Sequence, residues 1–317
     1  MRSRTKGILA ILASALGFAL MAFFVRLCDD WGAPVNSFQK SFFRNVVALT
    51  IAGVAWWKTA ERRTALSLRA KTMLILRATL GTIGIFANFY ALSNITIAEG
   101  QTLNKTAPFF TVLFAWLFLG ERATRRQILP LVLAFVGVVL IAKPGFAGAA
   151  AFPLAMGLLG GICAGGAYAC VRGLRRHDVA PAFIILFFSA FSCLASLPFM
   201  ITGFDPMTWR QVLILLGAGA SAALGQFGIT LAYGYAQPRE IAVFDYSNIL
   251  FTAALGFLFF AQVPDVWSVL GFAVILVAAF CMRGASTSGA AAAEEADSRG
   301  RTFQPFKPSQ HRLAGRP

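Results

Sequence analysis

Seven ionisable side chains fall within stretches of the sequence that are otherwise apolar enough to lie in a membrane. An ionisable side chain in hydrocarbon is costly, so it usually faces a protein cavity and takes part in binding or ion transfer. The cations exceed the anions by one, which favours a solute with a carboxylate or another anionic group. The cations are Lys40, Arg44, Arg77 and Lys105, and the anions are Glu99, Glu240 and Asp245.

The segment around Lys105 is the sharpest candidate for a solute-binding site. Lys105 is the ninth residue of an apolar stretch over 97–119, roughly 4–5 Å from the middle of that stretch at the helical rise. Pro108 cannot donate a backbone hydrogen bond to the carbonyl of Asn104, so the helix is expected to be irregular here. Irregular backbone at this depth is tolerated mainly beside a cavity. We therefore expect Asn104 and Lys105 to bind solute, although a structural ion pair would also explain Lys105.

A second polar segment, Asp245-Tyr246, follows Asn104-Lys105 at a distance of 141 residues. If the two apolar stretches run in opposite directions, Lys105 and Asp245 differ in depth by roughly 13 Å. A direct salt bridge between them is then not expected, and a solute, water or Arg77 could lie between them. We expect Asp245 and Tyr246 to join the solute site, with Arg77 as a partner of Asp245.

The remaining charges allow both a functional and a structural interpretation. Glu99 and Glu240 each begin a helix, where the helix dipole favours a carboxylate; the functional alternative makes them gates or proton carriers, with Asp245 as a second proton carrier. Lys40 and Arg44 are four residues apart and share one helix face. They could attract an anion into a cavity, or Lys40 could extend towards the membrane surface while Arg44 binds neighbouring carbonyls.

The elements that position these charges are predicted to be membrane-spanning helices. Of the 317 residues, 58% are hydrophobic and 13% charged, which excludes a soluble globular enzyme, a secreted disulfide scaffold and a disordered chain. Continuous apolar runs of this length favour helices over a β-barrel. Ten stretches are long enough to span a membrane: 7–25, 35–57, 72–92, 97–119, 127–142, 154–171, 181–201, 210–235, 240–262 and 266–282.

The net charge of +15 is explained by membrane orientation and does not require a nucleic-acid partner. With the N-terminus in the cytoplasm, 21 of the 28 Lys and Arg fall in cytoplasmic segments, against Arg26, Lys143 and Arg210 on the other side. This bias predicts a multi-pass protein of the cytoplasmic (inner) membrane with both termini in the cytoplasm. The segment 284–317 is predicted to be a disordered cytoplasmic tail.

A weak internal repeat divides the chain into two halves. Residues 74–121 and 215–262 align without gaps, with nine identical positions of 48, including Gly84/Gly225 and Glu99/Glu240. Five spans in each half is an odd number, so the halves must cross the membrane in opposite directions. Inverted repeats of this kind are typical of secondary transporters, with a site near the midplane between the halves. The predicted units are 1–143, helices one to five, and 144–283, helices six to ten.

The stretch from Tyr90 to Gly145, YALSNITIAEGQTLNKTAPFFTVLFAWLFLGERATRRQILPLVLAFVGVVLIAKPG, resembles the EamA family of the drug/metabolite transporter superfamily. SFFRNVVAL around Arg44 and LRATLGTIGIFANFYAL around Arg77 also resemble the family's second and third helices. The resemblance implies a ten-helix bundle of two inverted repeats. It also implies proton-coupled or exchange transport of small organic solutes, with helices four and nine and their neighbours lining a central cavity.

The sequence thus predicts a secondary active transporter of a small metabolite, such as an amino acid or another carboxylate-bearing solute. No G-x-x-x-x-G-K-[ST] loop occurs, so ATP hydrolysis is not expected to drive it. No cofactor or metal site is expected, and the expected partners are the solute and the lipid bilayer. A membrane-embedded enzyme is the first alternative, and it lacks paired catalytic groups within the spans; a non-transporting membrane scaffold is the second.

Overall fold

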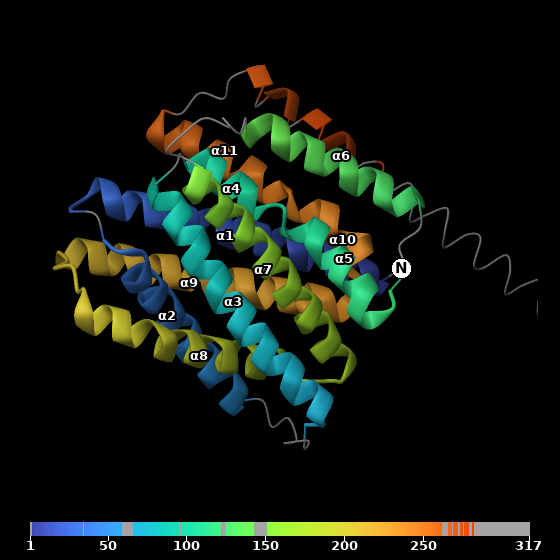
Figure 1. Cartoon of the computed structure of the whole chain (residues 1–317), viewed down its shortest axis with the longest axis horizontal. Helices are drawn as coiled ribbons and strands as arrows, with labels where there is room; N and C mark the ends of the chain where they lie inside the picture. The colour runs from blue at the N-terminus through green and yellow to red at the C-terminus, as the bar shows by residue number, and fades with distance from the viewer. Residues whose placement is uncertain are drawn as a thin grey trace, which may run out of the picture.

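The computed structural model describes residues 2–33, 35–58, 66–94, 97–121, 125–142 and 151–261, with scattered positions from 266 to 281. The regular structure of these residues is helical, as the composition predicts (Figure 1). The helices are α1 (Arg2–Asp30), α2 (Ser37–Lys58), α3 (Leu68–Asn94), α4 (Ile97–Asn104), α5 (Ala107–Leu119), α6 (Arg125–Ala142), α7 (Ala151–Arg176), α8 (Pro181–Thr202), α9 (Trp209–Tyr235), α10 (Pro238–Asp245) and α11 (Ser247–Phe260).

Seven segments of the described chain are long and apolar enough to cross a membrane. They include two that combine neighbouring helices, Gln101–Leu119 across α4 and α5, and Val243–Phe260 across α10 and α11. Ile128–Leu140 and Val269–Ala278 are shorter apolar helices. The ten spans stay a prediction, because the stretch 266–282 is described only in part, and the predicted tail 284–317 lies outside the described residues.

The predicted fourth and ninth spans are each interrupted at their polar segments. In the fourth span, Lys105 and Thr106 form a turn between α4 and α5, two residues before Pro108, which cannot continue the backbone ladder. In the ninth, Tyr246 separates α10 from α11 without a proline. There the Ser247 hydroxyl donates a 2.7 Å hydrogen bond to the carbonyl of Phe244, a local bond that competes with helical bonding.

The two halves of the chain pack against each other along most of their length. The most extensive contacts join α1 to α9, α3 to α7, and α2 to α8. In the numbering of the predicted spans, span one pairs with span eight, span three with span six, and span two with span seven. If spans one, two and three are swapped with their repeat equivalents six, seven and eight, the same three pairs result. This pairing brings the polar segments of both halves into the centre of one bundle.

Equivalent glycines lie at two of these helix contacts. A Cβ on Gly84 of α3 would lie 3.1 Å from the Cβ of Cys163 on α7. A Cβ on Gly225 of α9 would lie 2.7 Å from the ring of Phe18 on α1. Small residues at such crossings let neighbouring membrane helices pack by van der Waals contact. The repeated glycine found in the sequence therefore has the same packing role in both halves.

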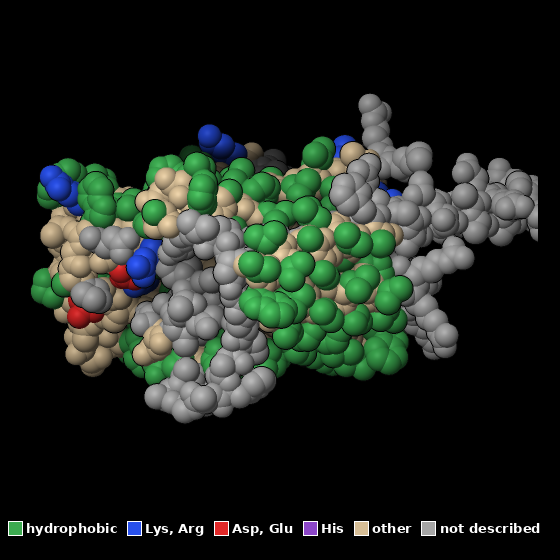
Figure 2. All heavy atoms as spheres, turned by 90° about the horizontal axis from the view of Figure 1, so that it is seen from above, with side chains coloured by type: hydrophobic (Ala, Val, Ile, Leu, Met, Phe, Trp, Pro, Cys, Tyr) green, Lys and Arg blue, Asp and Glu red, His purple; other side chains and the backbone are tan. Residues whose placement is uncertain are grey.

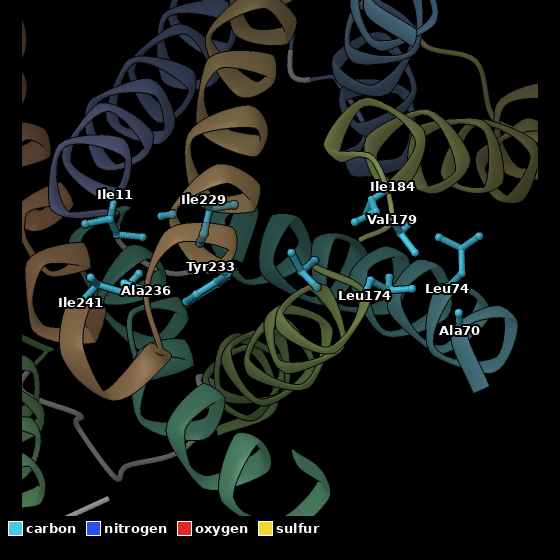
Figure 3. Packing of buried hydrophobic residues seen from close by; sticks show 12 residues of the cluster. Ile11, Ala70, Leu74, Leu174, Val179, Ile184, Ile229, Tyr233, Ala236 and Ile241 are labelled. Atoms are coloured by element: carbon cyan, nitrogen blue, oxygen red, sulfur yellow. The ribbon is translucent and has the colours of Figure 1, made fainter. Parts of the chain in front are cut away.

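The largest buried apolar cluster among the described residues lies towards the end of the bundle where the chain begins, here called the N-terminal end. Figure 3 shows how its side chains pack. Both halves contribute to it, with side chains from α1, α3, α7, α8, α9 and α10. Hydrophobic side chains also cover much of the outer face shown in Figure 2, where charged side chains are few. The buried cluster contains Ile11, Ala70, Leu74, Val171, Leu174, Val179, Ile184, Ile229, Ala232, Tyr233, Ala236 and Ile241.

Candidate solute cavity

A cavity of about 70 Å³ lies in the middle of the bundle. On each helix that supplies both, the lining residues are further from the N-terminal end than the residues of the buried cluster. The cluster therefore separates the cavity from the N-terminal end. The residues that line the cavity are Phe18, Met21, Arg44, Arg77, Gly81, Gly84, Ile85, Asn88, Phe89, Gln101, Asn104, Lys105, Ala107, Ala164, Ala167, Tyr168, Phe188, Gln226 and Asp245.

Lys105 and Asp245 form an ion pair on the wall of this cavity. The Lys105 Nζ lies 3.5 Å from the Asp245 Oδ2, and the two side chains are 6% and 3% exposed. The expectation that their depths would prevent a salt bridge was wrong. That expectation treated both spans as continuous helices, whereas α5 begins just after Lys105 and α10 ends at Asp245. Because α5 and α10 pack against each other, the two breaks lie close enough for the ion pair to form.

Arg77 does not contact Asp245, the partner that the sequence suggested, among the described contacts. Its Nη2 donates a 2.9 Å hydrogen bond to the Oε1 of Gln226, and its guanidinium lies 4.0 Å from the ring centroid of Phe188. Among the described contacts it makes no salt bridge with Asp245, whose carboxylate is taken by Lys105. Gln226 holds one edge of the guanidinium and Phe188 covers one face, so Arg77 is fixed in the cavity wall by α8 and α9.

The two cations of α2 have different surroundings although they share a helix face. Arg44 is 4% exposed and lines the cavity, where its Nε lies 3.1 Å from the Sδ of Met21. Lys40 turns instead towards Asp29 at the end of α1, with its Nζ 2.6 Å from the Oδ1 of that carboxylate. Arg44 therefore belongs to the cavity, and Lys40 belongs to an ion pair one helical turn away from it.

Of the other predicted site residues, Asn104 lines the cavity. Tyr246 is fully buried beside the break, but it packs in an apolar cluster with Val243 and Ile249 and is not part of the cavity lining. Glu240 lies in the first turn of α10, where its Oε2 accepts a 3.4 Å hydrogen bond from the backbone N–H of Gln237. The side chain of Glu99 lies outside the described residues.

Three uncharged polar side chains of the cavity were missed by sequence reasoning, because amides do not stand out as charges do in an apolar stretch. Asn88 and Gln101 line the cavity, as does Gln226. A signal existed for Asn88: Arg77, Gly81, Gly84 and Asn88 recur every three or four residues, which places them on one face of a helix. Gln101 had the same kind of signal, since it precedes Asn104 by three residues and Lys105 by four, whereas Gln226 had no comparable spacing.

A second group of charges lies nearer the N-terminal end. Glu121, just after α5, is 3% exposed in its side chain, and its Oε1 lies 2.9 Å from the Nε of Arg172 and 3.4 Å from an Nη of Arg176. Arg172 also donates to the carbonyl of Tyr233 on α9 at 2.9 Å. These bonds connect the end of α5 to α7 and α9, and so join the two halves of the chain.

The model of the EamA-like transporter family matches residues 5–143 and again residues 151–284. The pseudopaline exporter CntI of Pseudomonas aeruginosa is 31% identical over 277 residues, which cover 87% of this chain and 94% of the exporter. A riboflavin transporter of Vibrio cholerae is 27% identical over 279 residues, 86% of this chain and 91% of that protein.

A solved crystal structure with 17% sequence identity shares the fold at a TM-score of 0.66, over 85% of this chain and 95% of that one. The names of the family and of these relatives indicate transporters rather than enzymes. The resemblance noted from the sequence is thereby confirmed. With two family matches that together span nearly all of its helical part, this chain is a multi-pass membrane protein of the EamA-like transporter family.

Proposed function

We propose that this protein is a secondary active transporter of a small carboxylate-bearing metabolite. The observation that carries the proposal is the central cavity, which is lined by Arg44, Arg77 and Lys105 but by a single described carboxylate, Asp245. Buried cations in a membrane protein are costly unless an anion accompanies them. A carboxylate that enters the cavity would supply that anion.

We further propose that the two halves are inverted repeats, covering 1–143 and 144–283, with both termini in the cytoplasm of an inner-membrane protein. The repeat is supported by the pairing of spans, which stays the same when the two halves are swapped. The orientation is supported by the distribution of Lys and Arg. Two similar packings of one scaffold can then exchange roles and open the cavity to each side in turn. In the present conformation the apolar cluster closes the cavity towards the N-terminal end.

The ion pair at the cavity offers a route for coupling. Protonation of Asp245 would release Lys105 from its partner, which leaves the ammonium free to bind a solute carboxylate. A proton and the solute would then occupy the cavity together, as coupled transport requires. Simple exchange of one carboxylate solute for another is the alternative, since it needs no proton.

Flux measurements on purified protein in liposomes test the proposal. Vesicles that contain the pH indicator pyranine are offered carboxylic and amino acids one at a time, with and without an imposed pH gradient. Transport predicts accumulation of an unmodified carboxylate solute, with solute-dependent acidification if protons are coupled and counterflow alone if the protein exchanges solutes. Chemical conversion of the solute, or the absence of flux for every acid tested, would overturn the proposal.

A further inference from the structure

Five buried polar atoms in the cavity wall have no hydrogen-bond partner among the described residues. Three are donors, on Arg44, Arg77 and Gln101, and two are acceptors, on Asn88 and Asp245. All five side chains are at least nine-tenths buried. A buried donor or acceptor without a partner is costly, so donors and acceptors that converge on one cavity indicate a ligand that completes them. The atoms are Arg44 Nη1, Arg77 Nε, Gln101 Nε2, Asn88 Oδ1 and Asp245 Oδ1.

The charges of the lining point to two negative groups on that ligand. Lys105 and Asp245 balance each other in an ion pair, which leaves two guanidinium groups without a described carboxylate partner. Arg44 and Arg77 line the same cavity, so the repulsion between two like charges adds to the cost of burying them. One negative charge in the cavity would compensate only one of the two arginines.

Each of the two arginines keeps one nitrogen atom free for a carboxylate of the ligand. Arg77 uses Nη2 for Gln226 and keeps Nε available, while Arg44 uses Nε for Met21 and keeps Nη1 available. A guanidinium is planar and rigid, and its geometry matches that of a carboxylate. Because the arginines come from different helices, α2 and α3, each can take a separate carboxylate of one ligand.

The two free acceptors call for a donor on the same ligand. The Oδ1 of Asp245 is free while its Oδ2 faces Lys105, so this oxygen can accept from an ammonium group. The Oδ1 of Asn88 is a second, uncharged acceptor. The cavity volume of about 70 Å³ favours a small solute with a short carbon chain between these groups.

Building on the proposed function, we propose that the solute is a short amino dicarboxylate, with two carboxylates at Arg44 and Arg77 and an amino group at Asp245. Each end of such a molecule meets a group of opposite charge. In the exchange form of the proposed function the Lys105–Asp245 pair stays intact, because Oδ2 of Asp245 remains with Lys105 while Oδ1 accepts from the amino group. Gln226 and Phe188 act as positioning residues, since they hold Arg77 in its orientation and need not touch the solute.

A matched set of ligands tests this assignment on the unmodified full-length protein in detergent, by isothermal titration calorimetry at constant ionic strength. L-Glutamate has all three groups, glutarate lacks the amino group, and 2-aminobutyrate lacks the second carboxylate. We expect L-glutamate or L-aspartate to bind, glutarate at least about tenfold more weakly, and 2-aminobutyrate about 100-fold more weakly, because a lost charge-assisted contact inside a cavity is costly.

Two substitutions place the binding in the cavity. Arg44→Gln should weaken glutamate binding by about 100-fold and largely remove the difference between glutamate and 2-aminobutyrate, whereas Arg44→Lys should retain part of that difference. Arg210→Gln, outside the cavity on α9, should change neither. If 2-aminobutyrate binds as tightly as glutamate, or only glutarate binds, the amino dicarboxylate is refuted while a carboxylate transporter stands. If no acid binds and none crosses the membrane, both proposals fail.

Discussion

Substitutions in the Lys105–Asp245 ion pair should lower the stability of the protein. Comparing that loss with the loss of solute flux distinguishes a structural ion pair from a solute-binding one. At 3.5 Å and an effective dielectric constant of about 20, the Coulomb attraction is about 5 kcal/mol. Removing one partner leaves the other charge buried and uncompensated, which typically costs about 3–5 kcal/mol. We therefore expect Lys105→Met and Asp245→Asn each to lower the free energy of unfolding by roughly that amount.

The double variant Lys105→Met/Asp245→Asn should be more stable than either single variant, because it leaves no unpaired charge behind. Unfolding in mixed micelles titrated with SDS gives the three stabilities, and the non-additivity measures the coupling between the residues. The same three proteins are then reconstituted in liposomes for solute flux. We expect no flux from any of them, since the recovered stability does not restore the lost charges.

A similar ion pair outside the cavity provides the control. Lys40 and Asp29 lie 2.6 Å apart, with Lys40 buried, and the double variant Lys40→Met/Asp29→Asn should keep its flux. If the double variant at Lys105 and Asp245 regains both stability and flux, the pair is structural and the site assignment is wrong. If each single variant costs less than about 1 kcal/mol, as exposed pairs do, the buried pair described above is refuted.

Three further substitutions test individual contacts. Glu121→Gln should lower the free energy of unfolding by about 1.5–3 kcal/mol, the usual value for a hydrogen bond to a charged group. Arg176→Gln, at a side chain that is 42% exposed, should lower it by less than about 1 kcal/mol. Equal losses of stability in thermal unfolding would contradict the role given to burial. Gly17→Ala should destabilise the protein by about 1–3 kcal/mol, because the new Cβ would lie 2.6 Å from a backbone nitrogen of α9. Gly53→Ala should not destabilise it, because the nearest atom to that Cβ would lie at 3.6 Å. Comparable melting temperatures for the two variants would count against the close crossing of α1 and α9. Tyr246→Phe should be neutral or stabilising by up to about 2 kcal/mol, since it removes a buried hydroxyl with no partner among the described residues. A loss of solute flux in this variant would instead place the hydroxyl in the solute site.

Much of the helical architecture follows from local sequence. Apolar runs of about 20 residues can satisfy their backbone hydrogen bonds in a membrane only as helices or closed barrels, so length and composition were enough to predict helices. The break before Pro108 was also predictable, because a missing N–H is a property of one residue. The break at Tyr246 had no such marker, and only the polar character of its neighbours indicated a special segment.

The candidate site was predictable in part, for a reason that concerns charge. Arg44, Arg77, Asn104, Lys105 and Asp245 all line the cavity, and the four charged ones stood out because charges are rare in apolar stretches. Neutral polar residues are less costly to bury than charges, so their signal in the sequence was weaker. Tyr246 was predicted at the site from its neighbours in sequence, but a helix turns about 100° per residue, and it faces an apolar cluster instead.

The sequence by itself determined that this chain is a bundle of membrane helices with costly charges at mid-depth, because the bilayer constrains every residue in the same way. Which charges meet was decided by the tertiary structure. Lys105 pairs with Asp245 rather than leaving that carboxylate to Arg77, because two interrupted helices from different halves bring their breaks close together. An ion pair depends on a few ångströms between atoms 140 residues apart in the sequence, and only the packing of helices sets that distance.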